Sequence, residues 1–79
     1  MAALQRPRYA IPDDITTALE ARDLMAAYRA RPDYQQNDYV GWITRAARSD
    51  TRANRLAQML EELDAGDAYM GMPYAAKRP

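Results

Sequence analysis

The stretch YVGWITRA at residues 39–46 decides the fold of this chain. Apolar side chains recur in it at i, i+3, i+4 and i+7, which is the spacing of one buried face of an α-helix. They are Tyr39, Trp42, Ile43 and Ala46. We therefore expect a helix over about residues 34–47. Asp33 and Gln36 have the spacing of a capping box, in which two side chains satisfy free backbone amides, so we expect them to start this helix.

A second helix is expected to follow within a few residues and to pack against the first. Its apolar residues repeat the same spacing, and they are Leu56, Met59, Leu60 and Leu63. Ser49 and Asp50 are residue types that cap helix starts, and Gly66 is the type that ends helices, so we expect this helix between them. The two apolar stripes are predicted to form the centre of the fold.

Two shorter helices are predicted upstream. Pro12 tolerates the first turn of a helix, and the two aspartates after it favour the positive end of the helix dipole. Asp23 is expected to cap a second helix over residues 24–30, which ends at the residue before Pro32. The core positions expected from both helices are Ile11, Ile15, Ala18, Leu19, Leu24, Met25 and Tyr28. No alternating apolar pattern predicts a strand, so the predicted fold class is all-α, a small bundle of four short helices.

The 79 residues make one domain, because so short a chain cannot support two cores. We expect the helical domain at residues 11–66. Residues 1–10 are polar and interrupted by a proline, which predicts a flexible, disordered N-terminal arm. The C-terminal tail, residues 67–79, holds two tyrosines and two methionines, which is more apolar surface than a solvated tail needs. We expect the tail to pack on the domain, with disorder as the alternative.

The composition argues against catalysis. The chain has no histidine and no cysteine, so it lacks the usual general base, the usual zinc ligands and any disulfide. Ser49 is expected at a helix cap, and the adjacent Glu61 and Glu62 are expected to be solvated near the end of a helix, where neighbouring side chains do not converge. No glycine-rich phosphate loop is present. We predict a protein that is not an enzyme and has no cofactor or metal site.

Charge and hydropathy bear on localisation and partners. No secretory signal and no run of about 18 apolar residues occurs, which predicts a cytoplasmic protein with no membrane span. The 11 basic and 11 acidic residues cancel, so the chain has no long-range field that would attract nucleic acid. Any electrostatic binding must therefore be local.

Four arginines gather around the start of the last helix, which ends in acids, and they are Arg45, Arg48, Arg52 and Arg55. A helix dipole favours the reverse order, so another interaction must favour this arrangement. One interpretation is structural: Arg52 borders the apolar face, where its guanidinium would pair with an acid on a neighbouring helix. The candidate acids are Asp23, Asp33 and Asp38. The other interpretation is a site in which the arginines and free helix amides bind a carboxylate or a phosphate.

Trp42 and Tyr39 also have two interpretations. Both fit the buried face of their helix, and both fit an aromatic anchor beside the arginines, which is a composition common in binding hot spots. The candidate residues for binding a partner or an anion are therefore Arg48, Arg52, Arg55, Trp42 and Tyr39.

Part of the chain resembles a known family. The residues that carry the resemblance are Tyr39, Val40, Trp42, Ile43, Ala46, Arg48, Thr51, Arg52, Arg55 and Leu56, with the entry IPDDI at residues 11–15. Their order is similar to that of the helical C-terminal domain of the YdeI/OmpD-associated bacteriocin-protection family, over about residues 10–66. Ala47, Ser49 and Asp50 depart from the family pattern, which usually has lysine, proline and glutamate there.

The resemblance implies a small helical domain linked to protection against bacteriocins or antimicrobial peptides, or to association with an outer-membrane porin. It implies no enzymatic activity. We expect a protein-interaction module with an unidentified protein partner. Two alternatives stay open: a nucleic-acid-binding or anion-binding domain that uses the basic strip Arg45–Arg55, and an accessory domain such as one half of a homodimer joined through the tail. The sequence does not determine the oligomeric state.

Overall fold

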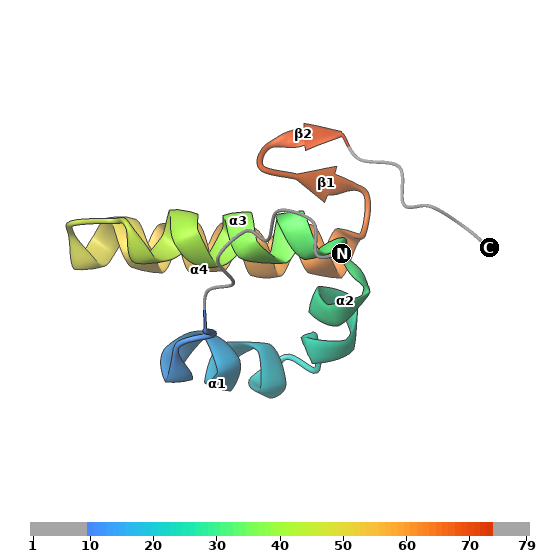
Figure 1. Ribbon diagram of the computed structural model, residues 1–79, viewed down its shortest axis with the longest axis horizontal. Coiled ribbons are helices and arrows are strands. Elements are labelled where there is room, and N and C mark those ends of the chain that lie inside the picture. The colour runs from blue at the N-terminus through green and yellow to red at the C-terminus, as the bar shows by residue number, and fades with distance from the viewer. Residues whose placement is uncertain (1–9, 74–79) are drawn as a thin grey trace, which may run out of the picture.

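The computed structural model describes residues 10–73, which form four helices and a small β-hairpin (Figure 1). The elements are α1 (Asp13–Ala21), α2 (Met25–Ala30), α3 (Asp33–Thr44), α4 (Ser49–Ala65), β1 (Ala68–Tyr69) and β2 (Met72–Pro73). The expected small bundle of four short helices is confirmed. Apart from Ala10, the expected N-terminal arm lies outside the described residues, as do residues 74–79 of the expected tail.

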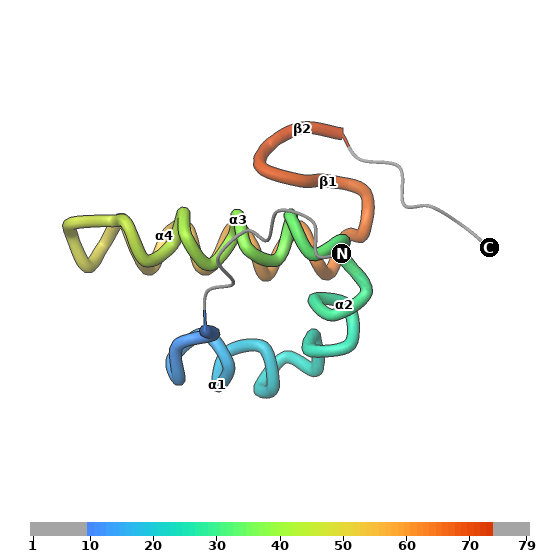
Figure 2. Tube along the Cα trace, viewed as in Figure 1, coloured from blue at the N-terminus to red at the C-terminus, as the bar shows by residue number. Residues whose placement is uncertain are grey.

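Helices α3 and α4 pack along each other and form the centre of the fold. The chain reverses direction between them through the short connection at residues 45–48, as the tube in Figure 2 shows. Tyr39 and Ile43 of α3 are fully buried, and so is Met59 of α4, with Leu60 and Leu63 nearly so. The two apolar stripes therefore meet as expected. Burial of each such side chain contributes about 1.5–3 kcal/mol.

Helices α1 and α2 cover one side of this pair, and the hairpin lies on the opposite side (Figure 1). Their buried side chains are Ile15, Leu19, Leu24 and Tyr28, and Ile11, Ala18 and Met25 are partly buried against the same core. All seven core positions expected from these two helices are confirmed. The hydroxyl of Tyr28 also donates to the carbonyl of Gln36, 3.2 Å away, which ties α2 to α3.

The starts of α2 and α3 differ from the expectation. Asp23 does not cap α2; it adopts a left-handed conformation with φ of 56°, and α2 begins after Leu24 without a side-chain cap. The capping box at the start of α3 is also wrong, because Pro32 precedes the helix and no side chain caps it. The side-chain amide of Gln36 instead donates to the carbonyl of Arg31, 2.8 Å away, so it closes the end of α2 rather than the start of α3.

The end of α4 agrees with the prediction, whereas its start does not. Gly66 ends the helix in a left-handed conformation with φ of 84°, and its amide donates to the carbonyl of Glu62 as expected. Ser49 does not cap the start, because it is the first helical residue and Arg48 occupies the cap position. The Asp50 carboxylate accepts the backbone amide of Thr51, 2.8 Å away, so it satisfies one free donor of the first turn.

The hairpin was not expected from the sequence, so the absence of strands was a wrong prediction. Ala68 pairs with Pro73 and Tyr69 with Met72, and the two residues between them, Met70 and Gly71, both have positive φ. Two successive positive φ values are the signature of a type I′ turn, whose twist suits a hairpin. Strands of two residues are too short to show alternation. Tyr69 and Met70 pack against the helical core, so this part of the tail folds back on the domain.

Candidate functional site

Trp42 and Arg55 form a fixed pair between α3 and α4. Both side chains are partly buried, and the guanidinium of Arg55 lies over the Trp42 ring, 5.3 Å from its centroid. The same guanidinium donates through Nη1 to the main-chain carbonyl of Trp42 at 2.7 Å. A hydrogen bond and a cation–π contact therefore hold the aromatic ring and the charge together.

Arg52 pairs with Asp14 at the start of α1, and not with the partners expected from the sequence, Asp23, Asp33 or Asp38. Its Nε lies 3.2 Å from one carboxylate oxygen and its Nη2 lies 3.1 Å from both oxygens. The hydrogen bond from Arg52 lowers the pKa of the Asp14 carboxyl. The pair is partly exposed, with side-chain exposures of 31% for Arg52 and 53% for Asp14, so it contributes at most about 1 kcal/mol.

Arg48 is the most exposed of the candidate arginines. Its side chain is 78% exposed and pairs with Asp50 at 3.2 Å, a contact between residues two apart in the chain. Arg48 is the cap residue immediately before α4, and Arg55 follows it by seven residues, so both lie in the half of the molecule at the start of α4. We call the set of Trp42, Arg48 and Arg55 the Trp42 surface.

Tyr39 lies apart from the Trp42 surface. Its side chain is fully buried, and its hydroxyl donates to the carboxylate of Glu62 on α4. Burial raises the pKa of the Tyr39 phenol, and the hydrogen bond and negative charge of Glu62 raise it further. The structure therefore places Tyr39 in the core, where it joins α3 to α4.

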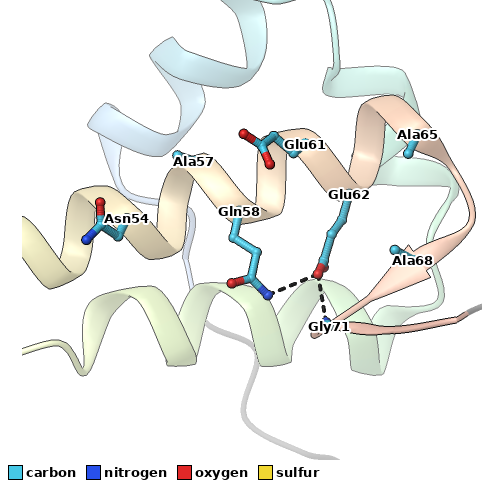
Figure 3. Close-up of a pocket in the computed structure, with 8 residues that line it drawn as sticks. All are labelled: Asn54, Ala57, Gln58, Glu61, Glu62, Ala65, Ala68 and Gly71. Atoms are coloured by element: carbon cyan, nitrogen blue, oxygen red, sulfur yellow. Dashed lines mark hydrogen bonds between the residues drawn. The ribbon is translucent and has the colours of Figure 1, made fainter.

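Glu62 was expected to be solvated, and the structure corrects this: only 6% of the residue is exposed. Its carboxylate accepts four hydrogen bonds. Two come from side chains, those of Tyr39 and Gln58, the latter at 3.0 Å. The other two come from the hairpin turn, from the amides of Met70 at 2.8 Å and Gly71 at 2.7 Å. Figure 3 shows Gln58 and Glu62 pointing toward Gly71, whereas Glu61 points away from it.

The hydrogen bonds determine the charge of Glu62. Burial alone would raise the pKa of its carboxyl, but the donors from Tyr39, Gly71, Gln58 and Met70 outweigh burial, and the pKa lies below its ordinary value. A carboxylate has about four lone-pair positions, and all are used here. Glu62 is therefore ionised at neutral pH and has no acceptor position left for a ligand.

Arg31 is the buried cation of the same region, with 7% of the residue exposed. It donates to the side-chain oxygen of Gln35 at 3.0 Å and to the main-chain carbonyls of Glu62 at 3.1 Å and Ala68 at 2.9 Å. Arg31 thus connects the start of α3, the end of α4 and the hairpin. One sequence signal could have indicated this cluster: Glu62 follows Met59 by three residues and precedes Leu63, so helical spacing places it beside the apolar face.

An open groove of about 550 Å³ runs between α4 and the hairpin (Figure 3). Its lining consists of Asn54, Ala57, Gln58, Glu61, Glu62, Ala65, Ala68 and Gly71. Within residues 10–73, no three histidine, cysteine, aspartate or glutamate side chains are grouped so that they could hold a metal ion. In the same part of the chain, no helix combines the length and apolar character needed to cross a bilayer.

The family assignment rests on a match that covers most of the chain. The model of a family described as "Bacteriocin-protection, YdeI or OmpD-Associated" matches residues 8–66, a range that includes α1 to α4 and ends before the hairpin. No curated protein and no solved structure matches the chain. The matched range holds the Trp42 surface, the Arg52–Asp14 pair and the side chain of Glu62, whereas the turn amides that bond Glu62 lie outside it. The chain is therefore a member of the bacteriocin-protection, YdeI or OmpD-associated family.

Proposed function

We propose that this chain is a non-enzymatic, cytoplasmic interaction domain that contributes to bacteriocin protection by binding a protein partner through the Trp42 surface. Family membership supports the biological setting. The observation that carries the proposal is the Trp42–Arg55 pair, in which an aromatic ring and a guanidinium are held together at a partly exposed position. Tryptophan and arginine are the residues most enriched in binding hot spots.

The geometry of the pair lowers the cost of binding. Long side chains lose conformational freedom when they are immobilised at an interface, typically about 0.5–1.5 kcal/mol each. Arg55 is already held by the Trp42 carbonyl and by the ring, so a partner meets it in an ordered state. The fork of the guanidinium retains donors that suit a carboxylate.

An acidic protein surface fits the Trp42 surface better than nucleic acid does. Arg48 and Arg45 are exposed, whereas Arg52 is engaged with Asp14 and Arg55 with Trp42. Nucleic-acid affinity grows with the number of phosphates neutralised, and this surface presents few exposed cations on a chain of zero net charge. A carboxylate-bearing partner that also covers the Trp42 ring would use both features.

A survival assay tests the proposal. Bacteria that express the wild-type chain are exposed to a bacteriocin beside bacteria that express Arg55→Glu or Arg48→Glu at the same protein level. We expect both variants to lose most of the protection, because removal of a hot-spot residue typically costs about 2 kcal/mol, or roughly thirtyfold in affinity. Arg48→Glu separates binding from folding, since Arg48 is highly exposed.

The matched control is Arg22→Glu, which makes the same charge change at an exposed position after α1. This variant should protect as well as the wild type. Circular dichroism shows whether each variant is folded. Full protection by both folded Trp42-surface variants would refute the proposed binding surface.

A further inference from the structure

The hairpin is held on the domain by three charged side chains. Arg31 donates to the carbonyl of Ala68, Glu62 accepts the amides of Met70 and Gly71, and Asp38 accepts the hydroxyl of Tyr69 at 2.6 Å. Glu62 makes the most hydrogen bonds to the hairpin of the three, because its carboxylate accepts both amides of the turn. Hydrogen bonds to an ionised carboxylate are roughly twice as strong as neutral ones.

Every group that bonds the Glu62 carboxylate is a donor, so the site is suited to the ionised form alone. Protonation would place a fifth hydrogen among the phenol of Tyr39, the amide of Gln58 and the two turn amides. The Tyr39 hydroxyl can also accept, and the Gln58 side chain can do so only after its amide turns to present its oxygen, whereas the two turn amides can only donate. Arg31 donates to the main-chain carbonyl of Glu62 and not to its carboxylate.

The connection between α4 and the hairpin is suited to act as a hinge. Gly66 has a φ of 84°, and apart from its own atoms and those of its two chain neighbours no atom lies within 4 Å of the position where its Cβ would be. Asp67, the next residue, is exposed. Rotation at residues 66–67 therefore meets little steric resistance.

The helical core does not depend on the hairpin. The fully buried apolar side chains among the described residues all lie between Ile15 and Leu63, whereas the hairpin contributes the partly buried Tyr69 and Met70. The Tyr69 ring makes edge contacts with Tyr39 and Tyr34, with centroids 5.4 and 6.2 Å apart. Loss of these contacts would uncover Tyr39 and Glu62 without opening the contact between α1, α2 and the α3/α4 pair.

We propose that the hairpin, residues 68–73, is a cover held closed by the negative charge of Glu62. It opens by rotation of the chain at Gly66 when Glu62 becomes neutral, while α1 to α4 stay folded. The closed state hides the Tyr39 hydroxyl and the Glu62 carboxylate; the open state presents them together with the Tyr69 ring. The cover is independent of the Trp42 surface, since the hairpin packs at the end of α4 and Arg48 lies at its start.

The direction of the pH dependence follows from the lowered pKa of Glu62. A group whose pKa is lowered in the folded state stabilises that state above its unfolded pKa, and the contribution is lost as pH falls through the folded value. The hairpin is therefore closed at neutral pH and opens in acid, below the ordinary carboxyl value of 4.5. Asp38, which accepts the Tyr69 hydroxyl, is the second carboxylate that holds the hairpin on the domain.

Amide hydrogen exchange followed by NMR tests the proposal on the full chain. In Glu62→Gln at pH 7, the amides of Met70 and Gly71 are expected to exchange roughly tenfold faster or more than in the wild type, because they lose their charged acceptor. Amides in the middle of α3 and α4 are expected to lose protection only by the smaller factor that matches the change in global stability, since Glu62 also accepts the Tyr39 hydroxyl. The matched control, Glu61→Gln, makes the same change at the adjacent exposed position and should leave the turn amides protected.

Two further measurements keep the test decisive if Glu62→Gln does not fold. Gly71→Val forces a β-branched residue to a φ of 80°, so it should open the hairpin by straining its turn while Glu62 is unchanged. The pKa of Glu62 should then return toward its ordinary value. In the wild type, lowering the pH should release the turn amides before the helix amides. Turn amides that stay protected in a folded Glu62→Gln, or that open in acid only together with the helices, would overturn the proposal.

Discussion

Replacement of Arg31 by methionine is expected to lower the free energy of unfolding by about 3–5 kcal/mol, because each buried acceptor left without its donor costs about 1–3 kcal/mol. Methionine fills a similar volume but donates no hydrogen bond. The side-chain oxygen of Gln35 and the carbonyls of Glu62 and Ala68 would each lose a donor at a buried or partly buried position. Small domains have only about 5–15 kcal/mol of stability in total, so the variant should be marginally folded.

Urea denaturation followed by circular dichroism measures this effect. The matched control is Arg29→Met, two residues earlier, where the side chain is exposed and lies over the Tyr28 ring at 5.9 Å from its centroid. We expect the control to lose less than about 1 kcal/mol. If both variants lost the same small amount of stability, Arg31 would not organise the cluster as described.

Replacement of Ile43 by alanine is expected to cost about 2–5 kcal/mol, because the side chain is fully buried between α3 and α4 and its removal leaves a cavity. The neighbouring Thr44 is exposed, and its hydroxyl donates only to carbonyls of its own helix, at 2.8 Å for Val40. Thr44→Ala should therefore stay within about 0.5 kcal/mol of the wild type. Thermal denaturation of both variants measures the two losses of stability. Equal decreases in melting temperature for Ile43→Ala and Thr44→Ala would contradict the packing of α3 on α4.

The helical periodicity of the sequence was sufficient to predict the core. Tyr39, Ile43, Met59 and Leu63 are buried where their spacing placed them, because the period of an α-helix fixes which side chains share a face. Gly66 ends α4 as expected, since glycine adopts a left-handed conformation without steric cost. Predictions that depend on periodicity within one helix were therefore correct.

Predictions that depended on side-chain capping were wrong at three helix starts. Asp23, Asp33 and Ser49 are all residue types that cap helices, yet none caps one here. In α3 the carbonyl of Pro32 accepts the first backbone amides, and the fixed φ of proline positions the chain without a side-chain bond. The loss of a side-chain cap costs only about 1 kcal/mol of stability, so tertiary packing can place a helix start where no side chain caps it.

The buried polar cluster could not be predicted because its members are distant in the chain. Arg31 contacts Glu62 across 31 positions and Ala68 across 37, and no local pattern encodes such pairings. The same applies to Arg52, whose partner Asp14 lies 38 positions away on a helix whose placement the sequence did not determine. The hairpin escaped prediction because two-residue strands have no periodicity, although Gly71 allows the positive φ that its turn requires.

The residues proposed to bind a partner and the residues that stabilise the fold lie at opposite ends of α4. Its start has Arg48 at the cap position and Arg55 in contact with Trp42, the residues of the surface proposed to bind a partner. Its end carries Glu62, which holds Tyr39 and the hairpin. Tyr39, a candidate binding residue in the sequence, therefore belongs to the structural end.

The most direct test of this assignment is a double-mutant cycle on Tyr39→Phe and Glu62→Gln, with the free energy of unfolding measured for the wild type, both single variants and the double variant. Because the two side chains share a buried hydrogen bond between α3 and α4, we predict a coupling of about 1 kcal/mol or more. Effects of the two substitutions that simply added, within about 0.3 kcal/mol, would contradict it.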